Sequence, residues 1–264
     1  MNQEKYYFDK PLLDKWEKND GVNFAIALAR ISGWLLQVDW LASYQDEPVT
    51  DMIPLRVSVG TDQSDIYDFT GKKDLDAYYE TILMPIATKR ANGKQGGIAN
   101  KFYSEEELFA LPLRIKPTEA EILEARKVIL QSDSFLKLIP TRINPEIPAY
   151  IAAHYTYGHC VVFAQAKKDG GTLPATAVIV SRYTEQFSGS RLGFCHSVIM
   201  RPDGEAEDVW GKQPLSKILD RYGILDYSLS TEEHDRVNET LKRNSPLVYN
   251  KSYDRISNLL KSIS

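Results

Sequence analysis

The chain has 264 residues, of which 43% are hydrophobic, and a formal net charge of −4. This size is enough to bury a core in one large domain or two small ones, and the mild acidity argues against a protein that binds nucleic-acid backbones. The charged first residues lack the apolar stretch of a secretory signal, and no apolar run approaches the roughly 18 residues that span a bilayer. We therefore expect a cytoplasmic protein without nucleic-acid or membrane partners, although signal-less export stays open.

The cysteines and histidines give no sign of a disulfide framework or a metal site. The chain has two cysteines, Cys160 and Cys195, which are too few to staple a protein of this length, so we expect free thiols. The four histidines, at positions 154, 159, 196 and 234, show no paired helical spacing. Lys94 lies among glycines but lacks the spacing of a phosphate-binding loop. We expect neither a metal nor a cofactor.

The first half of the chain predicts a helix followed by short strands. Residues 21–36 are rich in Ala, Leu and Ile and predict a buried helix that ends near Gly33. Alternating, β-branched and aromatic residues then predict strands at 36–41, 54–59 and 65–71. The segment 72–135 is predicted to be mostly helical.

Two helix starts and one boundary are visible in the middle of the chain. Ser104-x-x-Glu107 and Thr118-x-x-Glu121 have the pattern of capping boxes, in which a hydroxyl and a carboxylate satisfy the free N–H groups of a first helical turn. The proline-rich run 139–150 predicts extended chain and a domain boundary. Most of 80–150 and the tail 225–264 are predicted to be helical connectors.

The second half repeats the order of the first. An Ala-rich helix opens at Tyr157-Gly158-His159-Cys160 and ends near Gly170. Strands are predicted at 176–181, 193–200 and 205–211, with the tight turn Pro-Asp-Gly between the last two.

This recurrence can be tested position by position. A shift of 137 places Asn23 on Cys160 and Gly33 on Gly170, and a shift of 140 places Arg56, Asp68 and Gly71 on His196, Asp208 and Gly211. Arg56 and Asp68 are 68 − 56 = 12 residues apart in the first copy, and His196 and Asp208 are 208 − 196 = 12 residues apart in the second. The sequence therefore predicts an internal duplication in which only the second copy has a nucleophile and a base.

The residue types of the second copy suit nucleophilic catalysis. Cys160 is predicted at a helix N-terminus, where the macrodipole and free N–H groups lower the pKa of a thiol. His196 is predicted in a strand and Asp208 in the returning strand, so the carboxylate could orient the imidazole toward the sulfur. The alternative is a core role, because a cysteine on an Ala-rich helix is often only a small apolar residue. Strand alternation places Cys195 on the face opposite to His196, in the core.

A helix that opens with Gly-x-Cys, a strand with His before Pro-Asp-Gly, and Asp-x-x-Gly together resemble the papain-like superfamily in its broad sense. The resemblance covers about 155–225, with a weaker echo over 20–80. It implies that Cys160 is the nucleophile, His196 the general base and acid, and Asp208 the orienting group. The tryptophan often found after the cysteine and the upstream glutamine are absent. His154 stands six residues before the cysteine and is the candidate oxyanion donor, with Tyr157 and His159 as further cleft candidates.

The resemblance implies an α+β fold of two papain-like modules, each an N-terminal helix packed on a small antiparallel sheet. We expect a degenerate module at 1–90, a helical connector with the boundary at 91–150, and a catalytic module with C-terminal helices at 151–264. The expected function is a thiol-dependent hydrolase or acyl transferase that acts on an amide-type bond of a protein or peptide-like substrate. The alternative is a non-enzymatic binding, inhibitor or adaptor protein of bacterial or phage origin, built from the same two modules.

Overall fold

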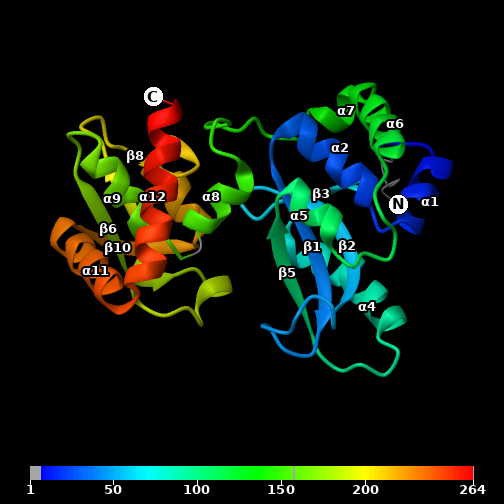
Figure 1. Ribbon diagram of the computed structural model, residues 1–264, viewed down its shortest axis with the longest axis horizontal. Helices are drawn as coiled ribbons and strands as arrows, with labels where there is room; N and C mark the ends of the chain where they lie inside the picture. The colour runs from blue at the N-terminus through cyan, green and yellow to red at the C-terminus, as the bar shows by residue number, and fades with distance from the viewer. Residues whose placement is uncertain (1–6, 157, 264) are drawn as a thin grey trace. The chain divides into compact units, whose positions relative to one another are not determined.

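The computed structural model describes residues 7–156 and 158–263. The chain divides into two compact units, residues 1–142 and 143–264. Each unit combines helices with one five-stranded antiparallel sheet (Figure 1), so the α+β class predicted from the sequence is confirmed. None of the helices within the described ranges is long and apolar enough to cross a membrane.

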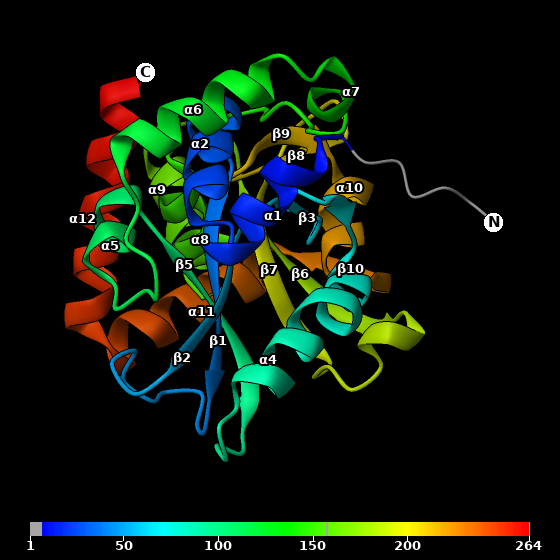
Figure 2. The same cartoon turned by 90° about the vertical axis from the view of Figure 1, so that its right-hand side faces the viewer.

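The first unit has its sheet in the order β4-β3-β2-β1-β5. Its strands are β1 (Leu35–Ala42), β2 (Ile53–Gly60), β3 (Ile66–Asp68), β4 (Gly71–Lys73) and β5 (Gly97–Tyr103). Its helices are α1 (Lys10–Lys18), α2 (Val22–Ser32), α3 (Leu75–Tyr78), the π-helical turn η1 (Tyr79–Leu83), α4 (Met84–Arg90), α5 (Glu105–Ala110), α6 (Glu119–Leu130) and α7 (Asp133–Leu136). The apolar helix α2 is covered by α6 (Figure 2), and its N-terminal part packs among the aromatic rings of Phe8, Trp16 and Phe135.

The second unit has its sheet in the order β9-β8-β7-β6-β10. Its strands are β6 (Ala175–Tyr183), β7 (Gly193–Met200), β8 (Glu205–Asp208), β9 (Gly211–Pro214) and β10 (Ile224–Ser230). Its helices are α8 (Ala149–Thr156), α9 (Cys160–Asp169), the 3-10 turn η2 (Glu185–Phe187), α10 (Leu215–Arg221), α11 (Thr231–Asn244) and α12 (Pro246–Ile263). Valines of β6 and β7 form a core with Ile218 and Leu219 of α10.

The two sheets have the same strand order when each is counted from its own first strand: fourth, third, second, first, fifth. The turn after the third strand is also the same. Gly71 and Gly211 have φ of 118° and 120°, a backbone conformation that favours glycine, and they pair with Asp68 and Asp208 respectively. The recurrence predicted from the sequence is thus present in the topology.

A β-bulge interrupts the same pair of strands in both sheets. In the first sheet Asp39 pairs with Arg56 and Trp40 with Pro54, which leaves Leu55 as the extra residue. In the second sheet Val178 pairs with His196 and Ile179 with Phe194, which leaves Cys195 as the extra residue. A bulge of this kind bends the strand and re-aims the next side chain. The residue that it precedes is Arg56 in one unit and His196 in the other.

The bulge corrects one prediction. Strict alternation had placed Cys195 on the face opposite to His196, but alternation does not continue through a bulge. Cys195 is partly buried and packs against the cluster that contains Val178, the cross-strand partner of His196. The Cys195 side chain therefore packs in the core on the same face of the sheet as His196, and not on the opposite face.

The predicted helical connectors also differ from the structure in a systematic way. The strands predicted in both halves are present, but β5 and β10 fall in segments expected to be helical. Both are fifth strands, each pairing with the first strand of its sheet. Because β5 belongs to the first sheet, 91–150 is not a separate connector, and the division between units falls after Arg142.

The two predicted capping boxes have different outcomes. Ser104 and Glu107 form the complete reciprocal box at the start of α5. At the start of α6, the Thr118 hydroxyl accepts from the backbone N–H of Glu121, but the Glu121 carboxylate is used elsewhere: it accepts from the Asn23 amide at 2.5 Å. Only half of the second box is therefore formed, because α2 competes for the carboxylate.

Candidate active site

Cys160 is the first residue of α9 and has 6% of its surface exposed. The thiol lies close enough to the His196 side chain and to the backbone N–H groups of Ser197 and Val161 for all three to lower its pKa. A helix N-terminus presents unpaired N–H groups and the positive end of the macrodipole. The position therefore favours a negatively charged sulfur, as the sequence predicted for this helix start.

His196 lies on β7 and Asp208 at the end of β8, and each has 1% of its side chain exposed. Nε2 of His196 is 3.2 Å from Oδ2 of Asp208. Nδ1 of His196 is 3.1 Å from the hydroxyl of Tyr222, which follows α10. Since Nε2 faces the carboxylate, a contact with the Cys160 sulfur falls to Nδ1, which also has the Tyr222 hydroxyl within hydrogen-bond distance. The structure thus brings the three predicted residues together in the order thiol, imidazole, carboxylate.

Asp208 is held from two further directions. Arg221, the last residue of α10, donates to Oδ2 at 2.5 Å, and the backbone N–H of Trp210 donates to Oδ1 at 2.9 Å. The Trp210 indole N–H in turn donates to the Thr156 hydroxyl at the end of α8. The bonds from Arg221 and Trp210 fix the orientation of the Asp208 carboxylate independently of its contact with the imidazole.

The ionisation of the three groups follows from this geometry. Burial alone would raise the pKa of the Cys160 thiol, but the charge and hydrogen bond of His196 and the backbone donors lower it below the usual value. Burial works against the imidazolium, yet Cys160 and Asp208 raise the pKa of His196 to about 9. Burial would also raise the pKa of Asp208, but Arg221 and His196 lower it to about 2. Each shift favours the charged form of its group: the thiolate of Cys160, the imidazolium of His196 and the carboxylate of Asp208.

The cleft candidates lie beside the nucleophile, at the junction of α8 and α9. The rings of His154 and His159 stack with their centroids 4.3 Å apart, and Nε2 of His154 is 3.0 Å from the Ser252 hydroxyl of α12. Burial lowers the pKa of both imidazoles, which favours their neutral forms. Donation from His154 to a substrate would require the contact with Ser252 to break. Tyr157 lies outside the described residues.

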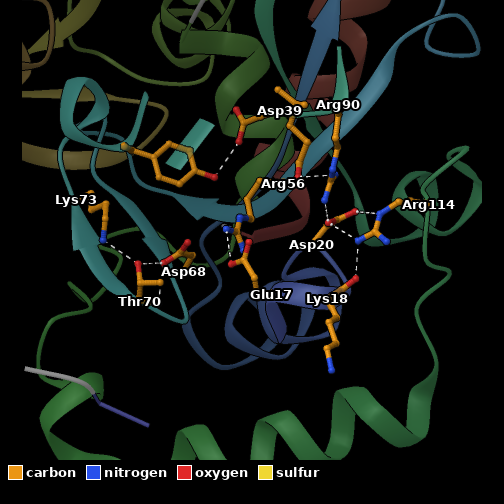
Figure 3. A network of polar contacts seen from close by, with 12 residues as sticks. Glu17, Lys18, Asp20, Asp39, Arg56, Asp68, Thr70, Lys73, Arg90 and Arg114 are labelled. Atoms are coloured by element: carbon orange, nitrogen blue, oxygen red, sulfur yellow. Dashed lines mark hydrogen bonds and ion pairs between the residues drawn. The ribbon is translucent and has the colours of Figure 1, made fainter. Parts of the chain in front are cut away.

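The equivalent positions of the first unit hold a different set of contacts, of which Figure 3 shows those of Arg56 and Asp68. Asn23 occupies the place of the cysteine and joins two parts of the unit: its amide donates to Glu121, and its oxygen accepts from the backbone N–H of Thr118. Arg56, in the place of the histidine, donates to Glu17 at 2.8 Å with 2% of its own side chain exposed. Asp68 accepts from Thr70 instead of from a histidine.

Asp39 completes the difference between the units. It pairs across the strands with Arg56, whereas the residue in that place beside His196 is Val178. Tyr78 and Gln37 donate to the Asp39 carboxylate at 3.0 and 2.8 Å, yet burial dominates and raises the pKa to about 7. Where the second unit has a thiol, an imidazole and a valine, the first unit therefore has an amide, a guanidinium and a carboxyl, which hold the unit together but include no nucleophile.

Several residues of the site could not be found from the sequence. Arg221 and Tyr222 follow a short helix and carry no motif, and their contact with Asp208 and His196 depends on how α10 packs. Trp210 lies inside the predicted Asp-x-x-Gly turn, but its bond to Thr156 joins residues 54 positions apart. The only signal for these residues is their nearness to the Asp-x-x-Gly segment.

Comparison of the chain with known proteins gives no relatives: no protein-family model, no curated protein and no solved structure matches it.

Proposed function

We propose that the second unit is a thiol-dependent hydrolase or acyl transferase of papain-like type that acts on an amide-type bond in a protein or peptide-like substrate. The observation that supports it most is the place of His196 between the other two residues: its imidazole lowers the pKa of the Cys160 thiol, and its Nε2 is 3.2 Å from Oδ2 of Asp208. A reactive cysteine needs a lowered pKa, a base within hydrogen-bond reach and a group that orients the base. These residues supply all three.

The reaction would proceed in two half-reactions. The Cys160 thiolate attacks the carbonyl carbon of the amide, and the tetrahedral species collapses as the carbon–nitrogen bond breaks and His196 gives its proton to the leaving amine. Neutral His196 then takes a proton from water as the water oxygen attacks the thioester; the carbon–sulfur bond breaks, the acid is released, and the Cys160 thiolate and the His196 imidazolium are restored. An amine in place of water would give transfer. Asp208 keeps the imidazole oriented through both steps.

A second candidate is a binding protein that retains the module without using it. The observation that favours it is the burial of the site, since only 6% of Cys160 is exposed and a substrate carbonyl must reach the sulfur. The first unit, which has no nucleophile at the equivalent position, is consistent with such a role. The two candidates differ in whether a small electrophile reaches Cys160.

An acylation experiment separates the two candidates. The protein is mixed with p-nitrophenyl acetate, release of p-nitrophenolate is followed by absorbance, and the acetylated residue is located by mass spectrometry. The enzyme proposal expects a burst close to one equivalent with the acetyl group on Cys160, because an activated thiolate is acylated faster than the thioester is hydrolysed. Cys160→Ala should abolish the burst, and His196→Gln should slow it by about 10²-fold or more.

Cys195→Ser is the matched control, since it removes the chain's other thiol and should keep the full burst. Acetylation of Cys160 no faster than that of free cysteine at the same pH would reject the enzyme proposal and leave the binding role.

A further inference from the structure

A fully buried histidine outside the proposed triad joins the helix of the nucleophile to the strand of the base. His234 lies on α11 with 0% of its surface exposed. Its Nδ1 is 3.1 Å from the Ser197 hydroxyl of β7, and its Nε2 is 3.2 Å from the side-chain oxygen of Gln165 on α9. Three elements that are far apart in sequence therefore meet at one imidazole.

The hydrogen bonds of His234 fix its protonation state. The Gln165 amide nitrogen donates to Asp169 at 2.7 Å, so the amide oxygen is the atom that faces His234. An amide oxygen can only accept, which requires the hydrogen on Nε2 and leaves Nδ1 to accept from Ser197. Burial lowers the pKa of His234 to about 4; the carboxylates of Asp235 and Asp169 oppose this shift, and the positive charge of Lys168 adds to it. The imidazole is neutral, with one tautomer.

This bridge ends on the nucleophile. Ser197, which is 0% exposed, directly follows His196, and its backbone N–H lies near enough to the Cys160 sulfur to lower the pKa of the thiol. A side chain fixed through its hydroxyl also fixes the peptide group that carries it. Gln165 lies on the same helix as Cys160. His234 thus sets the distance between α9 and β7 at the point where the sulfur meets the N–H.

The first unit has apolar residues in the same three places. The shifts of 137 and 140 place Gln165 on Leu28 and Ser197 on Val57. His234 is the fourth residue of the helix after the fifth strand, and Leu108 is the fourth residue of α5, the corresponding helix of the first unit. Both helices have a serine N-cap, Ser230 and Ser104, that accepts from the N–H of a glutamate. Leu28, Val57 and Leu108 are all buried.

This fold can therefore fill these positions with apolar side chains, and the polar bridge occurs only in the unit with the cysteine and histidine. We infer that His234 is a positioning residue for Cys160: with Ser197 and Gln165 it holds the Ser197 N–H on the sulfur and so stabilises the thiolate. The inference rests on the proposed function, because it assigns the bridge to the activation of the same thiol.

The test replaces the bridge by the side chains of the other unit. The triple variant Gln165→Leu, Ser197→Val, His234→Leu is made in a Cys195→Ser background, where Cys160 is the only thiol. The rate of alkylation by iodoacetamide is measured from pH 5 to 9, and folding is checked by thermal melting. The parent protein should show a midpoint below that of an ordinary thiol. The triple variant should melt cooperatively, with its midpoint raised by about one pH unit and its rate at pH 6 lowered about tenfold.

Ser197→Ala is the second variant, because it removes only the hydroxyl and keeps the strand intact should the triple variant fail to fold. Ser197→Ala should also raise the midpoint of the pH dependence of alkylation. Tyr249→Phe is the matched control, since it deletes a buried hydrogen bond to Asn238 of α11 away from the sulfur and should leave the profile unchanged. An unchanged profile in the folded triple variant or in Ser197→Ala overturns the inference and leaves the proposed function standing. If the alkylation midpoint of Cys160 in the parent protein is that of an ordinary thiol, both the inference and the proposed function are wrong.

Discussion

Arg221 donates a 2.5 Å hydrogen bond to Oδ2 of Asp208, the oxygen that also faces the imidazole of the proposed triad. Both partners have 1% of their side chains exposed. A carboxylate so deeply buried needs a compensating charge, and His196 can supply it only while protonated. Arg221 supplies a permanent charge, which keeps Asp208 ionised whatever the state of the histidine.

Arg221→Met should therefore destabilise the protein strongly. Removal of one partner of a buried pair leaves an uncompensated charge, a change that costs about 3–5 kcal/mol. Urea unfolding followed through tryptophan fluorescence measures the loss. Arg182→Met is the control, because Arg182 forms a pair of similar length with Asp226 at the surface, with side chains 64% and 55% exposed. It should lose less than about 1 kcal/mol. Equal losses in the two variants would contradict the role given to Arg221.

The protonation of His196 should depend on Cys160. Burial works to lower the pKa of His196, but Cys160 and then Asp208 raise it to about 9, so the imidazole stays charged through neutral pH and loses its proton near pH 9. In Cys160→Ala the pKa should fall toward that of an ordinary histidine. NMR titration of labelled histidine side chains measures both values. His234 provides an internal control, since its pKa is lowered to about 4 and it should not titrate above pH 6. A His196 pKa that is the same in both proteins would rule out the thiolate–imidazolium pair.

Gly211 should tolerate alanine less well than a glycine in a neighbouring turn. Its φ is 120°, and an added Cβ would come within 2.8 Å of the Ile143 side chain. Gly204 also has a positive φ, 81°, but open space around it. We expect Gly204→Ala to cost about 1 kcal/mol from backbone strain alone and Gly211→Ala about 2–3 kcal/mol. Urea unfolding midpoints compare the two, and the same cost at both positions would show that the contact with Ile143 is unimportant.

The first unit should become less stable as the pH rises from about 4 to 7. Burial raises the pKa of Asp39 to about 7 in the folded unit, against an ordinary value of 3.8. The stabilisation that comes from protonated Asp39 is therefore fully present below about pH 4 and is lost as the pH rises through 7. The shift corresponds to a loss on the order of 4 kcal/mol. Asp39→Asn should remove this part of the pH dependence. Unfolding is followed in a Trp210→Phe background, where the remaining three of the chain's four tryptophans lie in the first unit. If the free energy of unfolding falls equally with pH in the protein with and without the Asp39→Asn substitution, Asp39 is not the cause of the pH dependence.

The sequence predicts the central elements of each unit well, because their local signals agree with their tertiary environment. The buried helix α2 and strands β1, β2, β6 and β7 are continuous apolar or alternating segments. The fifth strands were missed for a physical reason. β10 is an edge strand whose residues are mostly exposed, and its conformation comes from pairing with β6 rather than from an apolar pattern.

The site was predicted in part for a similar reason. Cys160, His196 and Asp208 have residue types and spacing that suggest chemistry, and the structure brings them together. His234 stands in the charged run Glu-Glu-His-Asp-Arg, which is typical of an exposed helix face, yet it is fully buried. Its partners are 37 and 69 residues away, at distances in sequence over which no local pattern operates.

The bulge that precedes both Arg56 and His196 has a consequence for the history of the protein. If both units descend from one ancestral module, the bulge was already present in that ancestor, and the orientation of this side chain is older than the chemical difference between the units. If the first unit then lost its cysteine and histidine, the buried position after the bulge would have been open to a side chain with another role. On that history Arg56 and Asp39 would have taken the place of the lost residues, and a reactive site would have become a set of buried polar contacts that hold the unit together.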